Sequence, residues 1–359
     1  MAAGSLLRQW RRQKRRVVNL PAGLARRRLK PVRAKFYSDL WLAAAEDIGG
    51  ELSIAPNGLT QIRKGDRATF LRQSNLMLDS EIILIVFAIK ALHYDLMVRK
   101  SLRLPAFQRF TIETLKEAEA FLEAQPGPIV VKPADGTGGG HGVVTGITTP
   151  DKLRLAAQHA AGFNPVLLAE QQLTGACFRL VYMNGEFLDA VRRDSPSVTG
   201  DGTSTIAKLI KTENKSRENL DQIKALSPLI LDQESQNTLS ANGHSPKTVP
   251  ESGEEVRVKL AVNENAAAQN HIVRASVHPE IVDMGARLVS DFGLKFAGLD
   301  VTSGDISAPL LNGNTYFNEI NVNPGIHHHY LVANPDQSAN LAPTLLDRMF
   351  TNETGTLQL

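Results

Sequence analysis

The chain has 359 residues, 42% of them hydrophobic and 21% charged, which suits two or three core-bearing globular units and excludes a fibrous or largely disordered chain. The single cysteine, Cys177, excludes an intramolecular disulfide and a cysteine-rich zinc site, and fits a reducing cytoplasm. No run of about 18 uncharged apolar residues occurs, so no transmembrane helix is expected.

The formal net charge of +3 conceals a basic N-terminal arm, residues 1–35. This arm carries twelve Arg and Lys residues and no acid, which leaves 28 basic against 37 acidic residues in the rest of the chain. Such an arm is suited to contact nucleic acid, an anionic membrane surface or another polyanion. An unstructured, solvated leader is the simpler interpretation, and an Arg-rich start without acids also resembles an organelle transit peptide.

Residues 36–104 are predicted to form a small N-terminal α/β lobe. The spacing of apolar residues predicts a helix over 36–48, which Gly49-Gly50 ends. The other elements expected in the lobe are a turn at Pro56-Asn57-Gly58, a strand pair over 60–70 and one helix over 79–100.

The pattern changes at Pro105, and 105–345 is predicted to be one domain with subdomains at about 125–192 and 193–345. A C-terminal tail is expected over 346–359, loose from 351 on, and the polar stretch 212–254 is expected to be rich in loops. Strands are expected over 107–110, 128–132, 165–171, 178–183, 187–192 and 255–262, and helices over 113–124, 150–161, 206–211 and 279–292.

A glycine-rich segment follows the strand that ends at Lys132. Its glycines are Gly136, Gly138, Gly139, Gly140 and Gly142. Glycine allows backbone amides to turn together around phosphate oxygens, and Lys132 would add a point charge. Val143-Val144 leads back into a strand, so the segment is neither a P-loop nor a dinucleotide fingerprint. A glycine-rich hairpin without a ligand is the competing interpretation.

The stretch Thr315–Gly325 carries oxygen ligands on one face of a predicted strand. Because side chains alternate along a strand, Glu319 and Asn321 share a face. A carboxylate and a carboxamide at this spacing suit a hard cation such as Mg²⁺. Asp300, which ends the Gly-Leu-Asp run from Gly298, is expected to lie beside Glu319. The competing interpretation is a polar edge strand closed by a Pro-Gly turn.

Five segments in order resemble the ATP-grasp superfamily: Val131-Lys132-Pro133 with its glycine loop, 169–179, 200–206, 298–300 and 318–325. Within it, the chain is most similar to the ligase region of cyanophycin synthetase and bifunctional glutathione synthetases, since Gly-Asp-Gly at 200–202, Val277-His278-Pro279 and Pro324–His329 also match. The resemblance covers about residues 100–330. It implies an α/β (α+β) ATP-grasp fold with two subdomains clamping ATP. It also implies an ATP-dependent carboxylate-amine ligase that forms an amide through an acylphosphate and releases ADP and phosphate.

The resemblance implies roles for individual residues. Lys132 and a second lysine, Lys90 with Lys100 as the alternative, would bind ATP phosphate, and the glycine loop would close over the triphosphate. The adenine edge would be read by Glu170 and by the backbone of Gln171, Gln172 and Leu173. Mg²⁺, with Mn²⁺ as an alternative, would be held by Asp300, Glu319 and Asn321.

The remaining implied roles concern the amino acid or peptide substrate. Arg179 and Arg192 would face phosphate or the anionic acyl group, and Lys259 would replace an arginine that relatives carry near the acyl pocket. Asn263 and His329 would contact the substrate. A homodimer is expected from the resemblance alone.

Two departures from the family pattern bear on function. Cys177 stands where relatives usually carry an acid that accepts hydrogen bonds from ribose, and a thiol is a poor acceptor. The loop after Lys259 lacks the glycine pair of the relatives, so the acyl substrate is expected to differ from theirs. These departures motivate an alternative hypothesis, a non-catalytic ATP-grasp-like nucleotide-binding or regulatory protein.

Overall fold

The computed structural model describes residues 20–100, 102–135 and 142–359. Contacts within them divide the chain into two compact units. The first unit comprises the described residues of Met1–Lys30, Pro105–Leu173 and Ser195–Asn265, and the second comprises those of Pro31–Leu104, Thr174–Asp194 and Ala266–Leu359. Both units combine helices with antiparallel sheets, so the predicted α/β (α+β) class is confirmed. The domain boundaries drawn from the sequence stay a prediction.

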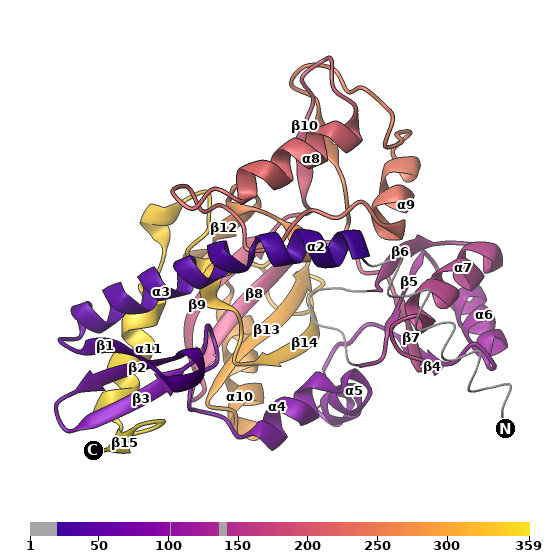
Figure 1. The fold of residues 1–359 in the computed structure, drawn as a ribbon. Helices are drawn as coiled ribbons and strands as arrows, with labels where there is room; N and C mark the ends of the chain where they lie inside the picture. Colours follow the sequence, from indigo (N-terminus) through magenta and orange to yellow (C-terminus); the bar gives the residue numbers. More distant parts are fainter. Residues whose placement is uncertain (1–19, 101, 136–141) are drawn as a thin grey trace, which may run out of the picture. The chain divides into compact units, whose positions relative to one another are not determined.

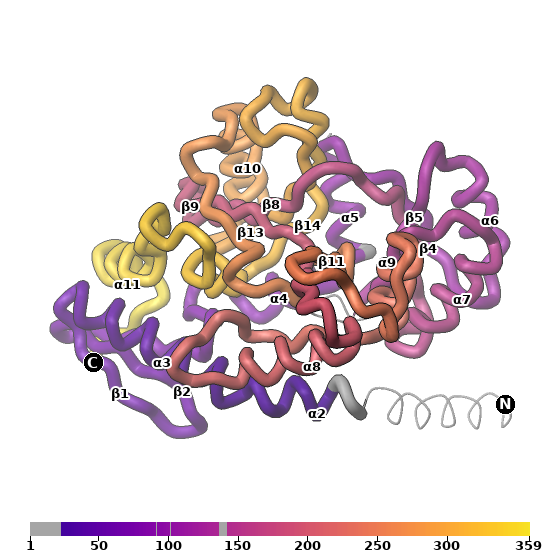
Figure 2. Tube along the Cα trace, turned by 90° about the horizontal axis from the view of Figure 1, so that it is seen from above, coloured from indigo at the N-terminus to yellow at the C-terminus, as the bar shows by residue number. Residues whose placement is uncertain are grey.

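A four-stranded antiparallel sheet with the order β4-β7-β5-β6 organises the first unit. Its helices α6 and α7 lie side by side against the sheet (Figures 1 and 2), and their apolar faces form the core with the inward-facing strand residues. The elements are β4 (Phe107–Phe110), α6 (Leu115–Ala124), β5 (Ile129–Pro133), β6 (Val144–Ile147), α7 (Pro150–Ala161) and β7 (Leu167–Gln171).

The predicted strand-loop-strand arrangement around the glycine segment is confirmed, because β5 and β6 pair antiparallel. Gly136, Gly138, Gly139 and Gly140 lie outside the described residues. Gly142 has a φ of +79°, and a Cβ placed there would lie 2.8 Å from the Phe163 ring and 2.9 Å from Pro133. Both the conformation and the available space therefore require glycine at 142.

The rest of the first unit is more helical than the sequence indicated. It contains β10 (Ser197–Thr199), α8 (Ile206–Arg217), α9 (Gln233–Ala241), β11 (Glu255–Arg257) and, near the N-terminus, α2 (Leu20–Arg28). The stretch 212–254 is rich in loops, as predicted, but it also contains the end of α8 and the whole of α9, which were not predicted. Helix α8 extends because Arg217 is buried and pairs with Glu213 one turn earlier, and α9 begins at a capping box made by Asp232 and Ser235. The predicted strand over 255–262 keeps three residues.

A five-stranded antiparallel sheet with the order β12-β9-β8-β13-β14 organises the second unit (Figure 1). One face is apolar and is covered by α10 and α4. The elements are β8 (Ala176–Met183), β9 (Glu186–Arg193), β12 (Asn270–Ile272), α10 (Pro279–Asp291), β13 (Phe296–Ser303) and β14 (Tyr316–Val322). The hairpin turn predicted at Asn184-Gly185 is confirmed, with φ values of 51° and 81°.

Helix α3 (Lys30–Asp47) packs in the second unit and buries Trp41, whose indole donates to the Gln73 carbonyl oxygen at 2.7 Å. The interpretation of the basic arm as unstructured is therefore wrong from Leu20 on, since α2 and the start of α3 are helical. Residues 1–19 lie outside the described residues.

The long helix predicted over 79–100 is two helices, α4 (Glu81–Ala88) and α5 (Lys90–Val98). The break falls at Ile89, whose ψ of 94° is extended rather than helical. The apolar spacing continues across the break, which is why periodicity alone did not reveal it. As a result, Lys90 occupies the first position of α5.

The predicted loose tail is also wrong. Strand β15 (Leu357–Gln358), which follows α11 (Leu341–Thr351), joins the sheet β1-β2-β3-β15 by pairing with β3. The Thr69 hydroxyl donates to the Gly355 carbonyl oxygen at 2.7 Å and secures this return. The other strands of the sheet are β1 (Glu51–Ala55), β2 (Leu59–Lys64) and β3 (Arg67–Leu71).

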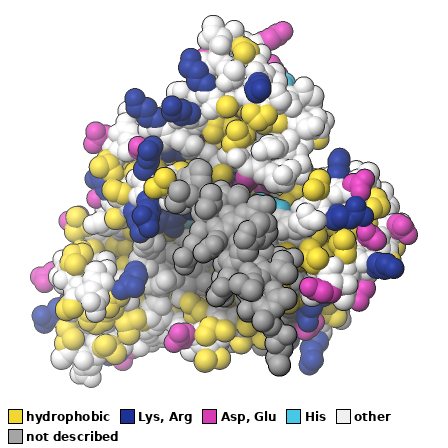
Figure 3. All heavy atoms as spheres, turned by 45° about the vertical axis from the view of Figure 1, so that its right-hand side comes forward, with side chains coloured by type: hydrophobic (Ala, Val, Ile, Leu, Met, Phe, Trp, Pro, Cys, Tyr) yellow, Lys and Arg dark blue, Asp and Glu magenta, His cyan; other side chains and the backbone are white. Residues whose placement is uncertain are grey.

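On the face drawn in Figure 3, described Lys and Arg side chains occur among Asp and Glu side chains, in keeping with the small net charge. Within the described residues, the structure contains no helix that is both long and apolar enough to span a membrane.

The C-terminal return can be tested at Gly355, which has a φ of +66° and whose Cβ would lie 2.4 Å from the Met77 carbonyl oxygen. We expect Gly355→Ala to lower the free energy of unfolding by about 2–3 kcal/mol, through backbone strain and this clash together. Gly65→Ala is the matched control, because Gly65 has a φ of +64° but no described atom within 4 Å of its Cβ, and it should cost only about 1 kcal/mol. Equal losses for both variants in urea denaturation would contradict the close approach at Gly355.

Candidate functional site

The polar face of the five-stranded sheet brings together most of the residues predicted to handle a metal ion. Asp300 on β13 lies directly opposite Arg179 on β8 and Glu319 on β14. Asn321 lies opposite Gly298, two residues before Asp300, and so shares the same face. The expectation that Asp300 lies beside Glu319 is confirmed.

Arg179 and Asp300 form a two-pronged ion pair. The guanidinium donates from Nε to Oδ1 at 2.6 Å and from Nη2 to Oδ2 at 2.7 Å. Asn321 Nδ2 also donates to Asp300 Oδ2, at 3.2 Å. Burial alone would lower the pKa of Arg179, but the Asp300 carboxylate more than offsets it and the pKa is raised. Arg179 is therefore a permanent cation directed at a predicted metal ligand.

Lys90 enters the same cluster from α5, and its Nζ lies 2.6 Å from Glu319 Oε1. His93, one turn further on, holds the helix on β14 because its Nε2 accepts a hydrogen bond from the Ile320 N–H at 3.1 Å. Lys100, the other lysine near the end of this helical stretch, pairs instead with Asp291 at 2.8 Å. Of the two, Lys90 is thus the one that lies beside the predicted metal ligands.

The donor set of this cluster fits a hard divalent cation. Asp300 and Glu319 supply carboxylate oxygens and Asn321 can supply its carboxamide oxygen, as Mg²⁺ or Mn²⁺ prefers. Among the described residues, no group of three His, Cys, Asp or Glu side chains is arranged to hold a metal ion, so the third protein ligand here would have to be Asn321. A site of this kind leaves coordination positions for water and substrate oxygens.

The two arginines predicted to face phosphate or the acyl group, Arg179 and Arg192, lie on opposite faces of this sheet. Arg192 lies opposite Phe178, on the other face from Arg179, and donates from Nε and Nη2 to Asp194. Its neighbour Arg193, for which the sequence predicts no role, is buried on the same face as Arg179. Burial and the nearby Arg179 lower the pKa of Arg193 to about 10. Only the strand register distinguishes the two arginines.

Cys177 lies on this polar face as well, opposite Thr302 and Arg193. Burial raises the pKa of its thiol, which therefore stays protonated at neutral pH. A neutral thiol is a weak hydrogen-bond acceptor, so the residue cannot replace the acid that the resemblance leads one to expect at this position.

His329, predicted to contact substrate, is fully buried in the second unit together with Asp189. Its Nδ1 lies 2.8 Å from Asp189 Oδ2. No hydrogen-bond partner is found among the described residues for His329 Nε2 or Asp189 Oδ1. The two preceding histidines are less enclosed, and His327 Nδ1 lies 3.2 Å from the Tyr37 hydroxyl. Asp189 gives no signal in the sequence, because it sits inside an apolar strand far from the histidines.

In the first unit, Lys132 and Glu170 form a close pair on adjacent strands, with Nζ 2.5 Å from Oε1. Glu170 is 7% exposed, so the pair is largely shielded from water. The N–H groups of Gln171 and Gln172 donate to the Ala106 and Pro128 carbonyls. A backbone contact from this segment to a base would therefore have to use a carbonyl group or Leu173.

Lys259, predicted to lie near an acyl pocket, is 3% exposed and lies in a closed ion cluster of the first unit. Its Nζ lies 2.7 Å from Asp232 Oδ2 and 2.9 Å from Glu264 Oε2. Burial lowers the pKa of Lys259, but Glu264 and Asp232 reverse this and the pKa is raised. Asn263 belongs to the 3-10 turn Val262–Glu264 that carries one of these partners.

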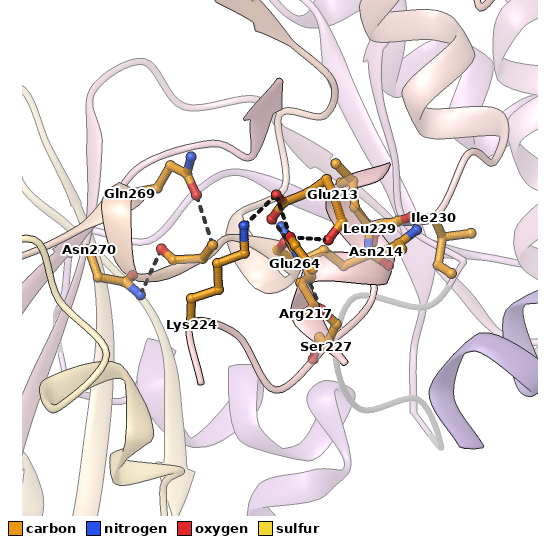
Figure 4. Close-up of polar contacts among 12 residues, drawn as sticks. Glu213, Asn214, Arg217, Lys224, Ser227, Leu229, Ile230, Glu264, Gln269 and Asn270 are labelled. Atoms are coloured by element: carbon orange, nitrogen blue, oxygen red, sulfur yellow. Dashed lines mark hydrogen bonds and ion pairs between the residues drawn. The ribbon is translucent and has the colours of Figure 1, made fainter. Parts of the chain in front are cut away.

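Figure 4 shows hydrogen bonds around Glu264, one of the carboxylates that contact Lys259. Buried Arg217 donates from Nη1 to the carbonyl oxygens of Ser227 and Glu264, at 2.7 and 2.8 Å, and from Nε to Glu213. The Glu264 carboxylate in turn accepts from the Ile230 N–H at 2.8 Å. Arg217 thus ties the loop around Ile230 to the turn that carries Glu264, and this limits the positions available to Lys259.

The chain is similar in sequence to two kinds of known proteins. Over 246 residues the chain is 30% identical to the cyanophycin synthetase of Trichormus variabilis, which covers 67% of this chain and 27% of that protein. It is 23% identical over 270 residues to the glutathione biosynthesis bifunctional protein GshAB of Clostridium perfringens, covering 74% of this chain and 34% of that protein. The chain thus spans about a quarter to a third of the length of these relatives. No family model matches it.

A solved structure shows the fold. The bifunctional glutathione synthetase from Pasteurella multocida superposes with a TM-score of 0.53, at 17% identity over 86% of this chain and 43% of that one.

Gly298 offers a test of how the polar face is built. A Cβ at Gly298 would lie 2.8 Å from Arg179 Cδ and 2.8 Å from Pro324 Cβ. We expect Gly298→Ala to displace the Arg179 side chain from Asp300 and to lower the free energy of unfolding by about 1–3 kcal/mol. Gly127→Ala, where no described atom lies within 4 Å of the new Cβ, serves as the control in urea denaturation. A Gly298 variant as stable as the control would contradict this packing.

Glu234 provides a pH-dependent test of the closed cluster. Its burial raises the pKa to about 7, although Lys259 opposes the shift. The folded pKa of Glu234 lies above the ordinary value of 4.5, so the folded state favours the protonated carboxyl. The stabilisation that comes from this protonation is complete below about pH 4.5 and is lost as the pH rises through 7. Glu234→Gln should therefore raise the free energy of unfolding by about 2–3 kcal/mol at pH 8 and leave it nearly unchanged at pH 4.5.

The control for this prediction is Glu251→Gln, at an exposed position of the same unit. Urea denaturation at both pH values measures the difference between the variants. An equal effect of Glu234→Gln at pH 4.5 and pH 8 would show that Glu234 does not titrate in this way.

Proposed function

We propose that the chain is an ATP-grasp protein and an ADP-forming carboxylate-amine ligase, on the basis of its similarity to cyanophycin synthetase and GshAB and of its fold. The observation that carries the proposal is the polar cluster of the second unit, in which two carboxylates, one carboxamide, Arg179 and Lys90 converge. Oxygen ligands beside fixed cations are what a metal-nucleotide complex requires.

The proposed reaction has two steps. A carboxylate oxygen of the acid substrate attacks the γ-phosphorus of ATP, the bond to the bridging oxygen breaks, and ADP leaves. An amine then attacks the acyl carbon of the resulting acylphosphate, phosphate leaves, and the amine loses a proton to give the amide. The first step spreads negative charge over the phosphoryl oxygens, so catalysis depends on positioning and charge neutralisation.

In the second unit, we assign Asp300, Glu319 and Asn321 to the divalent metal, with Mg²⁺ the proposed ion and Mn²⁺ the alternative. The bound ion would neutralise phosphate charge. Arg179 orients Asp300, and Lys90 is placed to contact a phosphate oxygen. Arg192 points away from this cluster, and Arg193 is the residue that shares its face.

In the first unit, we assign Lys132 and the glycine segment 136–142 to phosphate, and Glu170 with the backbone of Gln171–Leu173 to the adenine edge. The close Lys132–Glu170 pair supports this, because it sets a cation and an acceptor side by side on the adjacent strands β5 and β7. Lys259 and Asn263 keep a proposed role in the shape of the acyl pocket, although the Lys259 ammonium is enclosed by carboxylates.

We propose amino acids or short peptides as substrates, since the similar proteins are named for the synthesis of cyanophycin and glutathione. Cytoplasmic location is proposed from the single cysteine. A homodimer, and a contact of the basic arm with a polyanion, stay predictions.

Activity should appear as ADP release from ATP and Mg²⁺ in a screen of amino acid and short-peptide pairs, with the product identified by mass. Glu319→Gln should lower the rate at least about 100-fold, because it removes a charge that holds the metal while keeping the side-chain shape. Asp291→Asn, which changes an exposed carboxylate in the same unit, is the matched control and should retain the wild-type rate.

Failure of the chain to bind nucleotide at millimolar ATP would refute the ligase proposal. Nucleotide binding without amide formation for any pair would instead favour the non-catalytic alternative that Cys177 and the missing glycine pair suggest.

A further inference from the structure

Both carboxylates of the proposed metal set already pair with cations of their own chain. Lys90 Nζ lies 2.6 Å from Glu319, and the Arg179 guanidinium makes two bonds to Asp300. The side chains of Lys90 and Glu319 are 15% and 30% exposed. A pair with this little exposure is screened less by water than a surface pair, so its separation carries a real free-energy cost.

The wider charge distribution also disfavours a bare metal ion. Arg193 is buried on the same face, where it interacts electrostatically with both Arg179 and Asp300. Lys90, Arg179 and Arg193 thus place positive charge beside the two carboxylates. A divalent cation that arrives alone must compete with these cations, whereas a metal ion that arrives with a polyphosphate brings compensating negative charge.

The two cation-carboxylate pairs differ in how readily they can separate. Arg179 is held by two parallel bonds and by its packing over Gly298 beside Pro324, so it is fixed. Among the described residues, Lys90 makes one hydrogen bond to Glu319, from a flexible four-carbon stem at the first position of a helix that begins after a break. Lys90 is therefore the cation that can leave its carboxylate without disturbing the sheet.

We propose that Lys90 is an internal counter-ion that occupies Glu319 in the absence of ligand and transfers to a nucleotide phosphate when the metal-nucleotide complex binds. This inference rests on the proposed function, because it assigns Glu319 to the metal. Lys90 competes with a free divalent cation for Glu319, and phosphate removes this competition by giving the ammonium another partner. Metal ion and nucleotide then bind cooperatively, and by linkage each tightens the other by the same factor.

Binding of Mn²⁺ to the full chain tests the proposal without any turnover. The free Mn²⁺ concentration is measured by its electron paramagnetic resonance signal, first with metal alone and then with a non-hydrolysable ATP analogue. Wild-type protein should bind Mn²⁺ weakly alone and at least about five-fold more tightly with the analogue. Lys90→Gln should bind Mn²⁺ alone at least about five-fold more tightly than wild type, and the analogue should then tighten Mn²⁺ binding by a smaller factor than it does in wild type.

Three further variants separate charge from structure. Lys90→Arg keeps the positive charge and should retain weak binding of Mn²⁺ alone. Lys100→Gln removes a lysine that pairs with Asp291 on the same unit, and should behave as wild type. In the Lys90→Gln background, adding Glu319→Gln should abolish the gain in Mn²⁺ affinity, which assigns that gain to this site. Thermal melting confirms that each variant is folded.

The outcomes distinguish this inference from the proposed function. Unchanged or weaker binding of Mn²⁺ alone by folded Lys90→Gln would overturn the counter-ion role, even where wild type binds metal and nucleotide. A gain that survives Glu319→Gln would overturn it as well. Wild-type protein that binds neither nucleotide nor metal with nucleotide would instead refute the ligase proposal, on which the inference depends.

Discussion

The ion pair between Arg179 and Asp300 is the interaction on which the polar face of the second unit depends. Its two residues lie directly opposite each other on the adjacent strands β8 and β13. The strand register therefore brings the two side chains together, and their ion pair stabilises that register. A buried guanidinium that lost this partner would carry an uncompensated charge, which is far more costly than the pair itself. Because residue 298 is glycine and has no side chain, the methylene groups of Arg179 can pack against its backbone. The positions of Glu319 and Asn321 follow from the same register on the other side of β13.

The lysines Lys259 and Lys90 both pair with carboxylates, but they differ in how firmly they are held. Lys259 in the first unit is enclosed by Asp232 and Glu264 and is tied down through the Arg217 bonds to the Glu264 backbone. In the described part of the second unit, Lys90 pairs with one carboxylate, that of Glu319, and both side chains are partly exposed. A cation held on several sides contributes mainly to the arrangement of its own unit, whereas a cation with one partner can exchange it for a ligand. If Lys90 exchanged Glu319 for a nucleotide phosphate, Glu319 would become available to the metal ion only when nucleotide binds.

The sequence predicted correctly those helices and turns whose ends depend only on residues close by in the chain. The Asn184-Gly185 turn and the helix Pro150–Ala161 are local features, since left-handed backbone and a proline at the first helical turn require no distant partner. The predictions that were wrong depend on contacts far along the chain. The helix over 79–100 breaks at Ile89, and the last residues form a strand only because β3 offers an open edge. Helix α8 continues past Lys211 because Arg217 finds buried partners 10 and 47 residues away.

The sequence by itself determined that Glu319 and Asn321 share a face, because alternation along a strand is a property of the backbone. It also indicated the strand-loop-strand arrangement around the glycines and the order of the motifs. Only the tertiary structure decided that Arg193 rather than Arg192 faces Asp300, that Lys90 rather than Lys100 reaches Glu319, and that Lys259 and His329 are enclosed. The physical reason is that register, helix docking and burial are set by pairings between distant segments, and these pairings leave no mark in the spacing of neighbouring residues.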